Sequence, residues 1–273
     1  MRAAVVGHVE WVEFARVDRI PASGEIAHAG DSFSEPAGGG AVAAVQLARL
    51  GGEADLFTAL GDDELGERSR ERLGELGVAV RAATRAEPTR RALTLVEESG
   101  ERTITTIGER IAPRGGDSLP WDRLEGADCA YFTAGDADAL RAARGARVLV
   151  ATPRAGLLLR EAEVPLDALV FSDRDESERA AADRIAPAPA LVVATQGADG
   201  GRFETASGEE GRWDAQPPPG AIADTYGSGD SFAGALTWAL ASGKAPDEAV
   251  GVAARAGAIC MTGRGPYERQ LGA

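Results

Sequence analysis

Short, unbroken runs of apolar residues recur along the chain and alternate with segments of helical periodicity. Because these runs show no regular polar alternation, they are typical of strands that are buried on both faces of a mostly parallel sheet covered by helices. The runs are Ala3 to Val6, Ala54 to Ala59, Cys129 to Thr133, Val148 to Ala151, Ala168 to Phe171 and Leu191 to Thr195. The pattern predicts an α/β fold with a doubly wound, mostly parallel sheet flanked by helices.

Two pairs of extended segments do not fit this sheet pattern. One pair covers residues 9–20 and 25–33, and the other covers 92–96 and 102–107. Such segments predict a small sheet outside the main one, at about 9–33 and 92–107, which would form a β lid over ligands at the carboxyl edge of the strands. A plain surface hairpin explains the same pattern. Because no internal repeat or low-complexity linker is present, residues 1–273 are expected to form a single domain.

Composition narrows the classes of function. The formal net charge is −14 and Lys244 is the only lysine, so the chain lacks the clustered positive charge that binds nucleic-acid backbones. No stretch approaches the roughly 18 apolar residues that span a bilayer. Cys129 and Cys260 stand far apart without metal-ligand spacing. We therefore expect a cytoplasmic protein whose partners include neither nucleic acid nor membranes.

The strongest chemical signal lies late in the chain, between Ala223 and Leu236. Apolar residues from Phe232 onward recur at spacings of three and four, which predicts a helix whose first turn is rich in glycine. The amides of Gly227, Ser228 and Gly229 can approach an anion closely, and the free N–H groups and the helix dipole favour negative charge there. The segment therefore predicts a phosphate site.

Asp230 stands in this first turn, where a bound phosphoryl group would repel a carboxylate. A catalytic base explains its presence, because a carboxylate beside the transferring phosphate can accept the proton of an attacking hydroxyl, an effect worth about 100- to 10,000-fold in rate. A helix N-cap aspartate explains it equally well. The segment lacks the third glycine of a dinucleotide-binding fingerprint, and the chain contains no P-loop motif.

Resemblance to a known family decides between these readings. The segment from Asp224 to Asp230 resembles the C-terminal signature of the ribokinase-like (PfkB) carbohydrate kinases, and Gly38 to Gly51 resembles their N-terminal signature. The resemblance implies a doubly wound α/β domain with a small β lid. It also implies an ATP-dependent kinase that moves the γ-phosphoryl group to a hydroxymethyl group of a sugar or sugar-like molecule. Supporting segments run along the chain at Pro21–Glu25, Gly61–Gly66, Pro88–Thr89, Thr195–Gly200 and Ala253–Gly265.

The same resemblance implies roles for individual residues. Asp230 is the general base, and Gly227, Ser228 and Gly229 form the anion hole. The nucleotide would be bound by residues of a strand-end turn and of a late helix, which are Thr195, Gly197, Gly200, Ala253, Ala256 and Cys260.

The same resemblance implies sites for metal ions. The segment from Asp173 to Glu176 occupies the place of the family's Asn-x-x-Glu, so Glu176 is expected to organise Mg²⁺ and its waters, with Asp173 as a departure that adds negative charge. The alternative explanation of these residues is a solvated acidic helix start. Asp224 matches one contributor to the site where some relatives bind a monovalent cation such as K⁺.

The sequence departs from the family pattern at residues that are expected to bind the phosphoryl acceptor. The expected substrate-binding residues are Glu10, Val12, Gly39, Gly40, Val42 and Asp230. Val12 and Val42 stand where the family usually has polar groups that bind sugar hydroxyls, so a different ligand face is implied. Glu10, Glu13 or His8 would replace those groups. The alternatives are a nucleoside or vitamin-precursor kinase of the same fold and a non-catalytic ligand-binding relative. Pairing of lid strands between subunits would give a homodimer.

Overall fold

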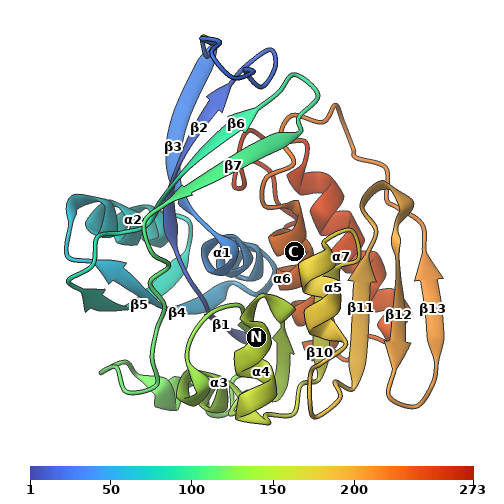
Figure 1. Cartoon of the computed structure of the whole chain (residues 1–273). Coiled ribbons are helices and arrows are strands. Elements are labelled where there is room, and N and C mark those ends of the chain that lie inside the picture. Colours follow the sequence, from blue (N-terminus) through green and yellow to red (C-terminus); the bar gives the residue numbers. More distant parts are fainter.

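The main sheet of the protein contains nine strands, and it is mostly parallel. The computed structural model describes residues 1–273, except for the side chain of Leu157. The strands are β1 (Arg2–Val6), β4 (Glu53–Gly61), β5 (Val78–Arg85), β8 (Cys129–Phe132), β9 (Val148–Ala151), β10 (Ala168–Ser172), β11 (Leu191–Thr195), β12 (Gly201–Thr205) and β13 (Glu210–Trp213). Their order is β13-β12-β11-β10-β9-β8-β1-β4-β5 (Figure 1). Only the pairings of β12 are antiparallel, so the predicted fold class is confirmed.

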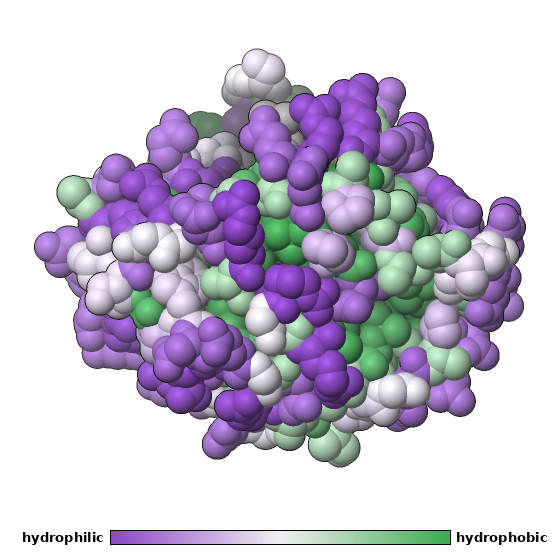
Figure 2. All heavy atoms as spheres, turned by 90° about the horizontal axis from the view of Figure 1, so that it is seen from below, coloured by the Kyte–Doolittle hydropathy of each residue, from purple (hydrophilic) through white to green (hydrophobic). Residues whose placement is uncertain are grey.

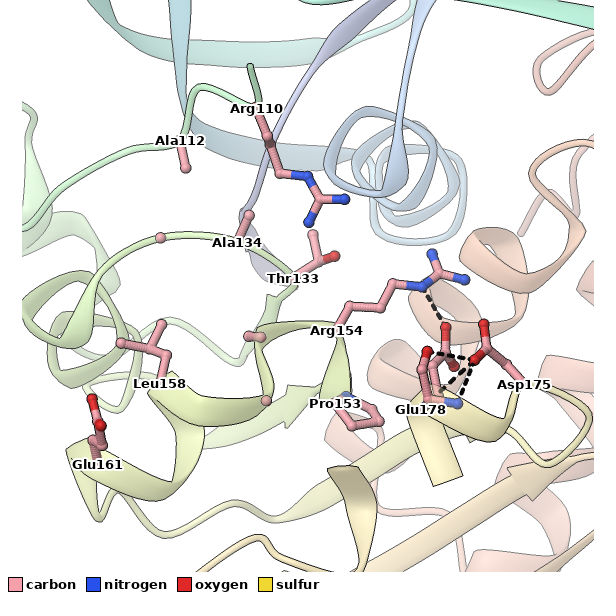
Figure 3. Close-up of a pocket in the computed structure, with 14 residues that line it drawn as sticks. Arg110, Ala112, Thr133, Ala134, Pro153, Arg154, Leu158, Glu161, Asp175 and Glu178 are labelled. Atoms are coloured by element: carbon pink, nitrogen blue, oxygen red, sulfur yellow. Dashed lines mark hydrogen bonds and ion pairs between the residues drawn. The ribbon is translucent and has the colours of Figure 1, made fainter. Parts of the chain in front are cut away.

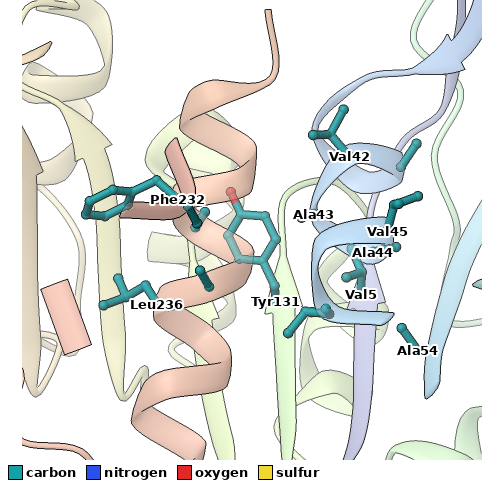
Figure 4. Close-up of a cluster of buried hydrophobic side chains, with 14 of the residues drawn as sticks. Val5, Val42, Ala43, Ala44, Val45, Ala54, Tyr131, Phe232 and Leu236 are labelled. Atoms are coloured by element: carbon teal, nitrogen blue, oxygen red, sulfur yellow. The ribbon is translucent and has the colours of Figure 1, made fainter. Parts of the chain in front are cut away.

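Helices cover both faces of this sheet because successive strand residues point to opposite sides. In β1, Ala3 and Val5 join one hydrophobic core, whereas Ala4 and Val6 join the other. Figure 4 shows part of the first core, where Val5 and Tyr131 of the sheet lie between side chains of α1 and α6. The helices are α1 (Gly39–Gly51), α2 (Glu64–Glu75), α3 (Ala137–Ala143), α4 (Gly156–Ala162), α5 (Glu176–Ala182), α6 (Ser228–Ala241) and α7 (Pro246–Cys260).

A second sheet stands outside the main one, as the sequence predicts. It contains β2 (Glu10–Arg16), β3 (Asp31–Ala37), β6 (Arg91–Val96) and β7 (Arg102–Ile107), in the order β3-β2-β6-β7. These strands form the lid at the top of Figure 1. The expected strand at 25–33 is displaced along the chain: β3 begins at Asp31 and continues to Ala37, because it pairs with β2 along its whole length. The edge strand β7 exposes Ile104 and Ile107, and the homodimer stays a prediction.

The order of the strands fixes where a ligand can bind. The chain leaves β1 to form β4 and β5 on one side, and later returns to form β8, β9, β10 and β11 on the other side. β1 therefore lies at the point where the direction of winding reverses. In open α/β sheets, ligands bind outside the carboxyl ends of the strands at this point. The lid leaves the main sheet near the same ends, because β2 and β3 follow β1 along the chain, and β6 and β7 follow β5.

The surface carries mainly polar side chains. In the view of Figure 2, hydrophilic residues cover most of the underside of the molecule, and hydrophobic residues gather between them near the middle. Among the residues that the structure describes, no helix is both long and apolar enough to pass through a bilayer.

Candidate active site

The first turn of α6 offers free backbone donors. Gly227, the residue before the helix, has φ 79°, a left-handed conformation that glycine adopts without strain. The amides of Gly227, Gly229 and Asp230 have no acceptor among the described residues, and Gly229 has open space where a side chain would stand. The amide of Ser228 donates to the carbonyl of Thr225 at 3.4 Å. An anion approaching this helix end would therefore meet unpaired N–H groups.

The Asp230 carboxylate stands beside these donors and is mostly shielded from water. Its side chain is 17% exposed, and its Oδ1 lies 3.7 Å from Nη1 of Arg154. Burial raises the pKa of Asp230, while the Arg154 and Arg102 guanidiniums lower it. A partly desolvated carboxylate with a raised pKa is a stronger proton acceptor than an ordinary one.

Glycines at the start of α1 allow this helix to approach the carboxylate. A Cβ atom on Gly39 would lie 3.0 Å from Oδ1 of Asp230 and 3.2 Å from Oγ1 of Thr133. A Cβ atom on Gly40 would lie 2.7 Å from the carbonyl oxygen of His8, closer than real Cβ contacts come. The predicted substrate residues Gly39 and Gly40 therefore bring the start of α1 against Asp230 and against the end of β1.

Polar side chains at the ends of two strands also lie close to the start of α1. His8 follows β1 and Thr133 follows β8; both are buried, and neither His8 Nδ1 nor Thr133 Oγ1 has a hydrogen-bond partner among the described residues. Burial and the charges of Arg110, Arg90 and Arg154 lower the pKa of His8 to about 3. The imidazole is therefore neutral near pH 7 and is available as a hydrogen-bonding group, not as a charge.

Three arginines surround this region. Nε of Arg90 lies 3.6 Å from Oε2 of the buried Glu10, and Nε of Arg154 donates to Oε1 of the buried Glu178 at 2.5 Å. Arg110 makes no hydrogen bond or ion pair with any residue that the structure describes. Burial and the positive charges of Arg90 and Arg154 lower the pKa of Arg110, although Glu10 opposes this. Arg110 is therefore a cation that no carboxylate pairs with among the described residues.

A cavity of about 760 Å³ opens at the carboxyl ends of β8, β9 and β10. Figure 3 shows Arg110 and Arg154 reaching from opposite walls toward the same space, with Thr133 between them. Asp175 and Glu178 line the wall formed by the start of α5. The cavity is large enough for a ligand of sugar size together with part of a nucleotide.

The acidic segment before α5 has one residue in the cavity lining, and the role predicted for Glu176 and Asp173 stays a prediction. Glu176 is exposed and does not line the cavity, whereas its neighbour Asp175 does. Asp175 caps α5, because its Oδ1 accepts hydrogen bonds from the amides of Ser177 and Glu178 at 2.9 and 3.1 Å. Asp173 accepts a hydrogen bond from Gln196 at 2.9 Å, outside the cavity lining.

The predicted nucleotide residues do not line this cavity either. Thr195 ends β11, and Gly197 and Gly200 form the turn after it with φ 63° and 79°. This turn matches its prediction as a glycine-rich strand end, and the guanidinium of Arg174 covers Gly197. On α7, the predicted residues Ala253, Ala256 and Cys260 have no exposed surface. The partly exposed face of α7 is formed instead by neighbours such as Val252 and Ile259.

Several further predicted residues lie in the protein interior. Val12 and Val42 are 0% exposed and belong to the core. Asp224 is buried, and it accepts a hydrogen bond from the Tyr226 amide at 2.8 Å. Burial raises the pKa of Asp224, while Arg102 and Arg16 lower it. These guanidiniums would oppose a cation bound at the same carboxylate, and K⁺ binding stays a prediction.

The sequence pattern predicts Glu10 as a site residue, but it does not indicate most of the other polar residues of the site. Arg90, Arg110, Thr133, Arg154 and Asp175 were not among the candidates, and His8 was named only as a replacement. One signal is present in the sequence, because His8 and Arg154 each follow a predicted buried strand closely and Thr133 ends one. Polar residues directly after parallel strands indicate a binding site, because ligands bind outside the carboxyl ends of such strands. Glu13 is exposed on β2, and Trp11 packs under Arg68, whose Cζ lies 4.4 Å from the ring centroid.

Comparisons with known proteins agree with this geometry. The family model described as pfkB family carbohydrate kinase matches residues 2–270. An ATP-dependent ribose-1-phosphate kinase of Halopiger xanaduensis is 30% identical over 266 residues, which covers 87% of this chain and 85% of that protein. A ribokinase of Arabidopsis thaliana, solved with ribose and ATP, has a TM-score of 0.74 at 21% identity, over 96% of this chain and 93% of that one. An adenosine kinase of Sinorhizobium meliloti has a TM-score of 0.77 at 21% identity, over 97% and 94%.

These matches establish the class of the protein. The chain belongs to the pfkB family of carbohydrate kinases. It is a phosphotransferase, as the two glycine-rich signatures predict.

Proposed function

We propose that this protein transfers the γ-phosphoryl group of ATP to a hydroxymethyl group of a sugar or sugar-like molecule, with Asp230 as the general base. One observation carries the proposal: a shielded carboxylate with a raised pKa stands directly beside unpaired backbone amides at the start of α6. The amides supply charge stabilisation for a phosphoryl group, and the carboxylate supplies proton acceptance for the incoming hydroxyl. Both are needed for phosphoryl transfer to an alcohol.

The proposed step follows from these positions. The hydroxyl oxygen of the acceptor attacks the γ-phosphorus, its proton passes to a carboxylate oxygen of Asp230, and the bond from the γ-phosphorus to the bridging oxygen breaks to release ADP. Asp230 itself is not part of the cavity lining. Arg154 lies 3.7 Å from Asp230 and does line the cavity, so its guanidinium would stabilise charge on a group transferred between them. The adenine end of ATP would lie toward the turn at Gly197 and the partly exposed face of α7.

The acceptor is proposed from the names of relatives together with the site. The matched proteins are named as kinases of ribose 1-phosphate, of ribose and of adenosine. These three acceptors share a ribosyl ring with a free hydroxymethyl group. His8 and Glu10 are buried beside Gly38 and Gly39 at the start of α1, and we assign the hydroxyls of such a ring to these side chains. A ribosyl compound is therefore the proposed acceptor, and a nucleoside is the second candidate within this class.

A panel of acceptors tests the proposal. The protein, ATP and Mg²⁺ are incubated with ribose, ribose 1-phosphate or adenosine, and ADP formation is measured. ADP is expected with at least one of these compounds. Ribose 5-phosphate is the matched control, because its hydroxymethyl oxygen already carries a phosphate, and it should give only background ADP. If no acceptor of the panel raises ADP formation above the rate without acceptor, the proposed reaction is wrong.

Mg²⁺ is proposed to enter with the nucleotide. No group of three or more His, Cys, Asp or Glu side chains that could hold a metal occurs among the described residues. A site of that kind is not required, because Mg²⁺ is usually held by one or two carboxylates together with substrate phosphates and water. The Glu178 carboxylate is already bound to Arg154 and to the Ser172 amide. Glu161 also lines the cavity, but Asp175 stands beside Glu178 and Arg154 (Figure 3). We therefore assign Mg²⁺ to Asp175, where the ion would neutralise charge on the phosphates.

Paired substitutions separate the two neighbouring acids. Asp175→Asn is expected to raise the Mg²⁺ concentration that gives half-maximal ADP formation by about 10-fold, a typical cost of losing one positioning group of a metal. Asparagine still caps a helix, so α5 should remain intact. Glu176→Gln removes the exposed neighbouring charge and should leave the Mg²⁺ dependence within about 2-fold of the unmodified protein. If Glu176→Gln raised this Mg²⁺ concentration and Asp175→Asn did not, Mg²⁺ would be assigned to Glu176 instead.

A further inference from the structure

Three guanidiniums act on the buried His8, and a neutral sugar would not require them. Sugar hydroxyls are bound by carboxylates, amides and imidazoles, which His8 and Glu10 already provide. Arg90 and Arg110 stand at the two ends of the lid hairpin, because Arg90 directly precedes β6 and Arg110 follows β7. Arg154 follows β9. Guanidiniums from three separate parts of the chain therefore surround one space, and all three act on the pKa of the buried His8.

The nearby carboxylates contact groups other than Arg110. Asp175 and Glu161 also line the cavity, and Oδ1 of Asp175 caps α5. Glu178 is bound to Arg154 at 2.5 Å and to the Ser172 amide at 2.9 Å. The second contact of Arg154 is Asp230, at 3.7 Å. Glu10 lies 3.6 Å from Arg90. None of these carboxylates is paired with Arg110.

Arg110 is thus a cation in the cavity lining without an ion-pair partner among the described residues. A guanidinium carries five N–H donors in a planar fork that matches the oxygens of a phosphate, and such pairs are among the strong hydrogen bonds of proteins. An anion bound here would also relieve the repulsion between Arg110 and its two positively charged neighbours. The geometry therefore favours a ligand whose acceptor end is anionic.

We propose that Arg110, with Arg90 beside it, binds a phosphate group that the acceptor already carries, so that the substrate is a sugar phosphate with a free hydroxymethyl group. This inference rests on the proposed kinase function and specifies its substrate class. In the reaction, the bound phosphate of the acceptor stays intact, the hydroxymethyl oxygen gains the γ-phosphoryl group, and Asp230 takes the proton. The products are ADP and a sugar bisphosphate.

The competing role for Arg110 is contact with the γ-phosphate of ATP. The two roles predict different losses of activity when the guanidinium is removed. An arginine that binds the acceptor's phosphate matters only for acceptors with that phosphate. An arginine that binds the γ-phosphate matters for every acceptor alike, and also for ATP.

Arg110→Gln tests the inference with three acceptors that differ only at the first carbon of ribose: ribose 1-phosphate, ribose and adenosine. The unmodified protein should use ribose 1-phosphate with a kcat/KM at least about 10-fold above that for the other two. The variant should lose about 10- to 100-fold in kcat/KM for ribose 1-phosphate, mainly through KM. Its KM for ATP and its kcat/KM for ribose should stay unchanged. Arg141→Gln, which removes an exposed arginine on α3 that pairs with Asp138, is the matched control and should behave like the unmodified protein.

Two outcomes would overturn the inference: equal use of all three acceptors by the unmodified protein, or an equal loss for all acceptors in Arg110→Gln. Calorimetric titration of ribose 1-phosphate without ATP separates this inference from the proposed reaction. Binding that Arg110→Gln weakens about 10-fold or more, and that Asp230→Asn retains, supports the phosphate site even if no turnover is found. Absence of such binding in the unmodified protein contradicts the site.

Discussion

Replacing Asp230 with asparagine is expected to lower kcat by about 100- to 10,000-fold, the range for loss of a general base. The amide of asparagine has nearly the same shape as the carboxylate but does not accept the proton of the attacking hydroxyl. The anion-binding amides at the start of α6 belong to the backbone and remain in place. Nucleotide binding, measured by calorimetry, should therefore persist while ADP formation, measured at saturating substrates, is almost lost.

The stability of Asp230→Asn separates a catalytic defect from misfolding. Because burial raises the pKa of Asp230 in the folded state, folding favours the protonated carboxyl. The stabilisation from this group is therefore full below its unfolded pKa and is lost as pH rises through the folded pKa. A neutral asparagine should make the folded state at least as stable near pH 7, so Tm should stay equal or rise. Turnover within a few fold of the unmodified protein would remove Asp230 from its proposed role.

Arg154→Gln is expected to lower kcat by about 100-fold and to shift the pH dependence of activity. The loss in rate follows from removing a preorganised donor near the transferring phosphoryl group. Asp230 must be ionised to accept a proton, so activity falls as pH falls through its pKa. Arg154 lowers the pKa of Asp230, and its removal should raise this pKa. The acid limb of the kcat profile should therefore move to higher pH.

Arg154→Lys is the matched control for charge. Lysine retains the positive charge but not the planar fork of donors, so the acid limb should stay close to that of the unmodified protein while kcat remains reduced. Both variants leave the buried Glu178 with a weakened or lost partner, so Tm must be measured for each. An acid limb that stays in place in Arg154→Gln would show that Arg154 does not control the ionisation of the catalytic base.

The central strands of the main sheet could be predicted from the sequence, whereas its edge strands could not. Strands such as β1 and β8 are buried on both faces and therefore appear as unbroken apolar runs. The edge strand β13 mixes exposed and half-buried residues, so its pattern is not distinct from that of a loop. Residues 21–30 are a similar case, because the start of β3 at Asp31 is set by pairing with β2 and not by local pattern.

The same distinction applies to the site. Asp230 and its anion-binding turn are contiguous in sequence, so one segment contains the whole signal. Arg90, Arg110 and Arg154 come from separate loops, and only the order of strands in the sheet brings them together. The choice between Asp175 and Glu176 depends on which residue caps α5 and so on the rotation of that helix. Sequence pattern locates helix starts only to within a few residues.

The absence of a side chain at Gly40 allows the start of α1 to pack closely against the residues that follow β1. The first turn of α1 touches the main chain of His8 at a distance that leaves no room for even a methyl group. Any side chain at this position would push the helix away from the end of β1, and Gly39 would carry its contact with Asp230 away as well. The spacing between Asp230 and His8 is thus limited by steric exclusion at Gly40.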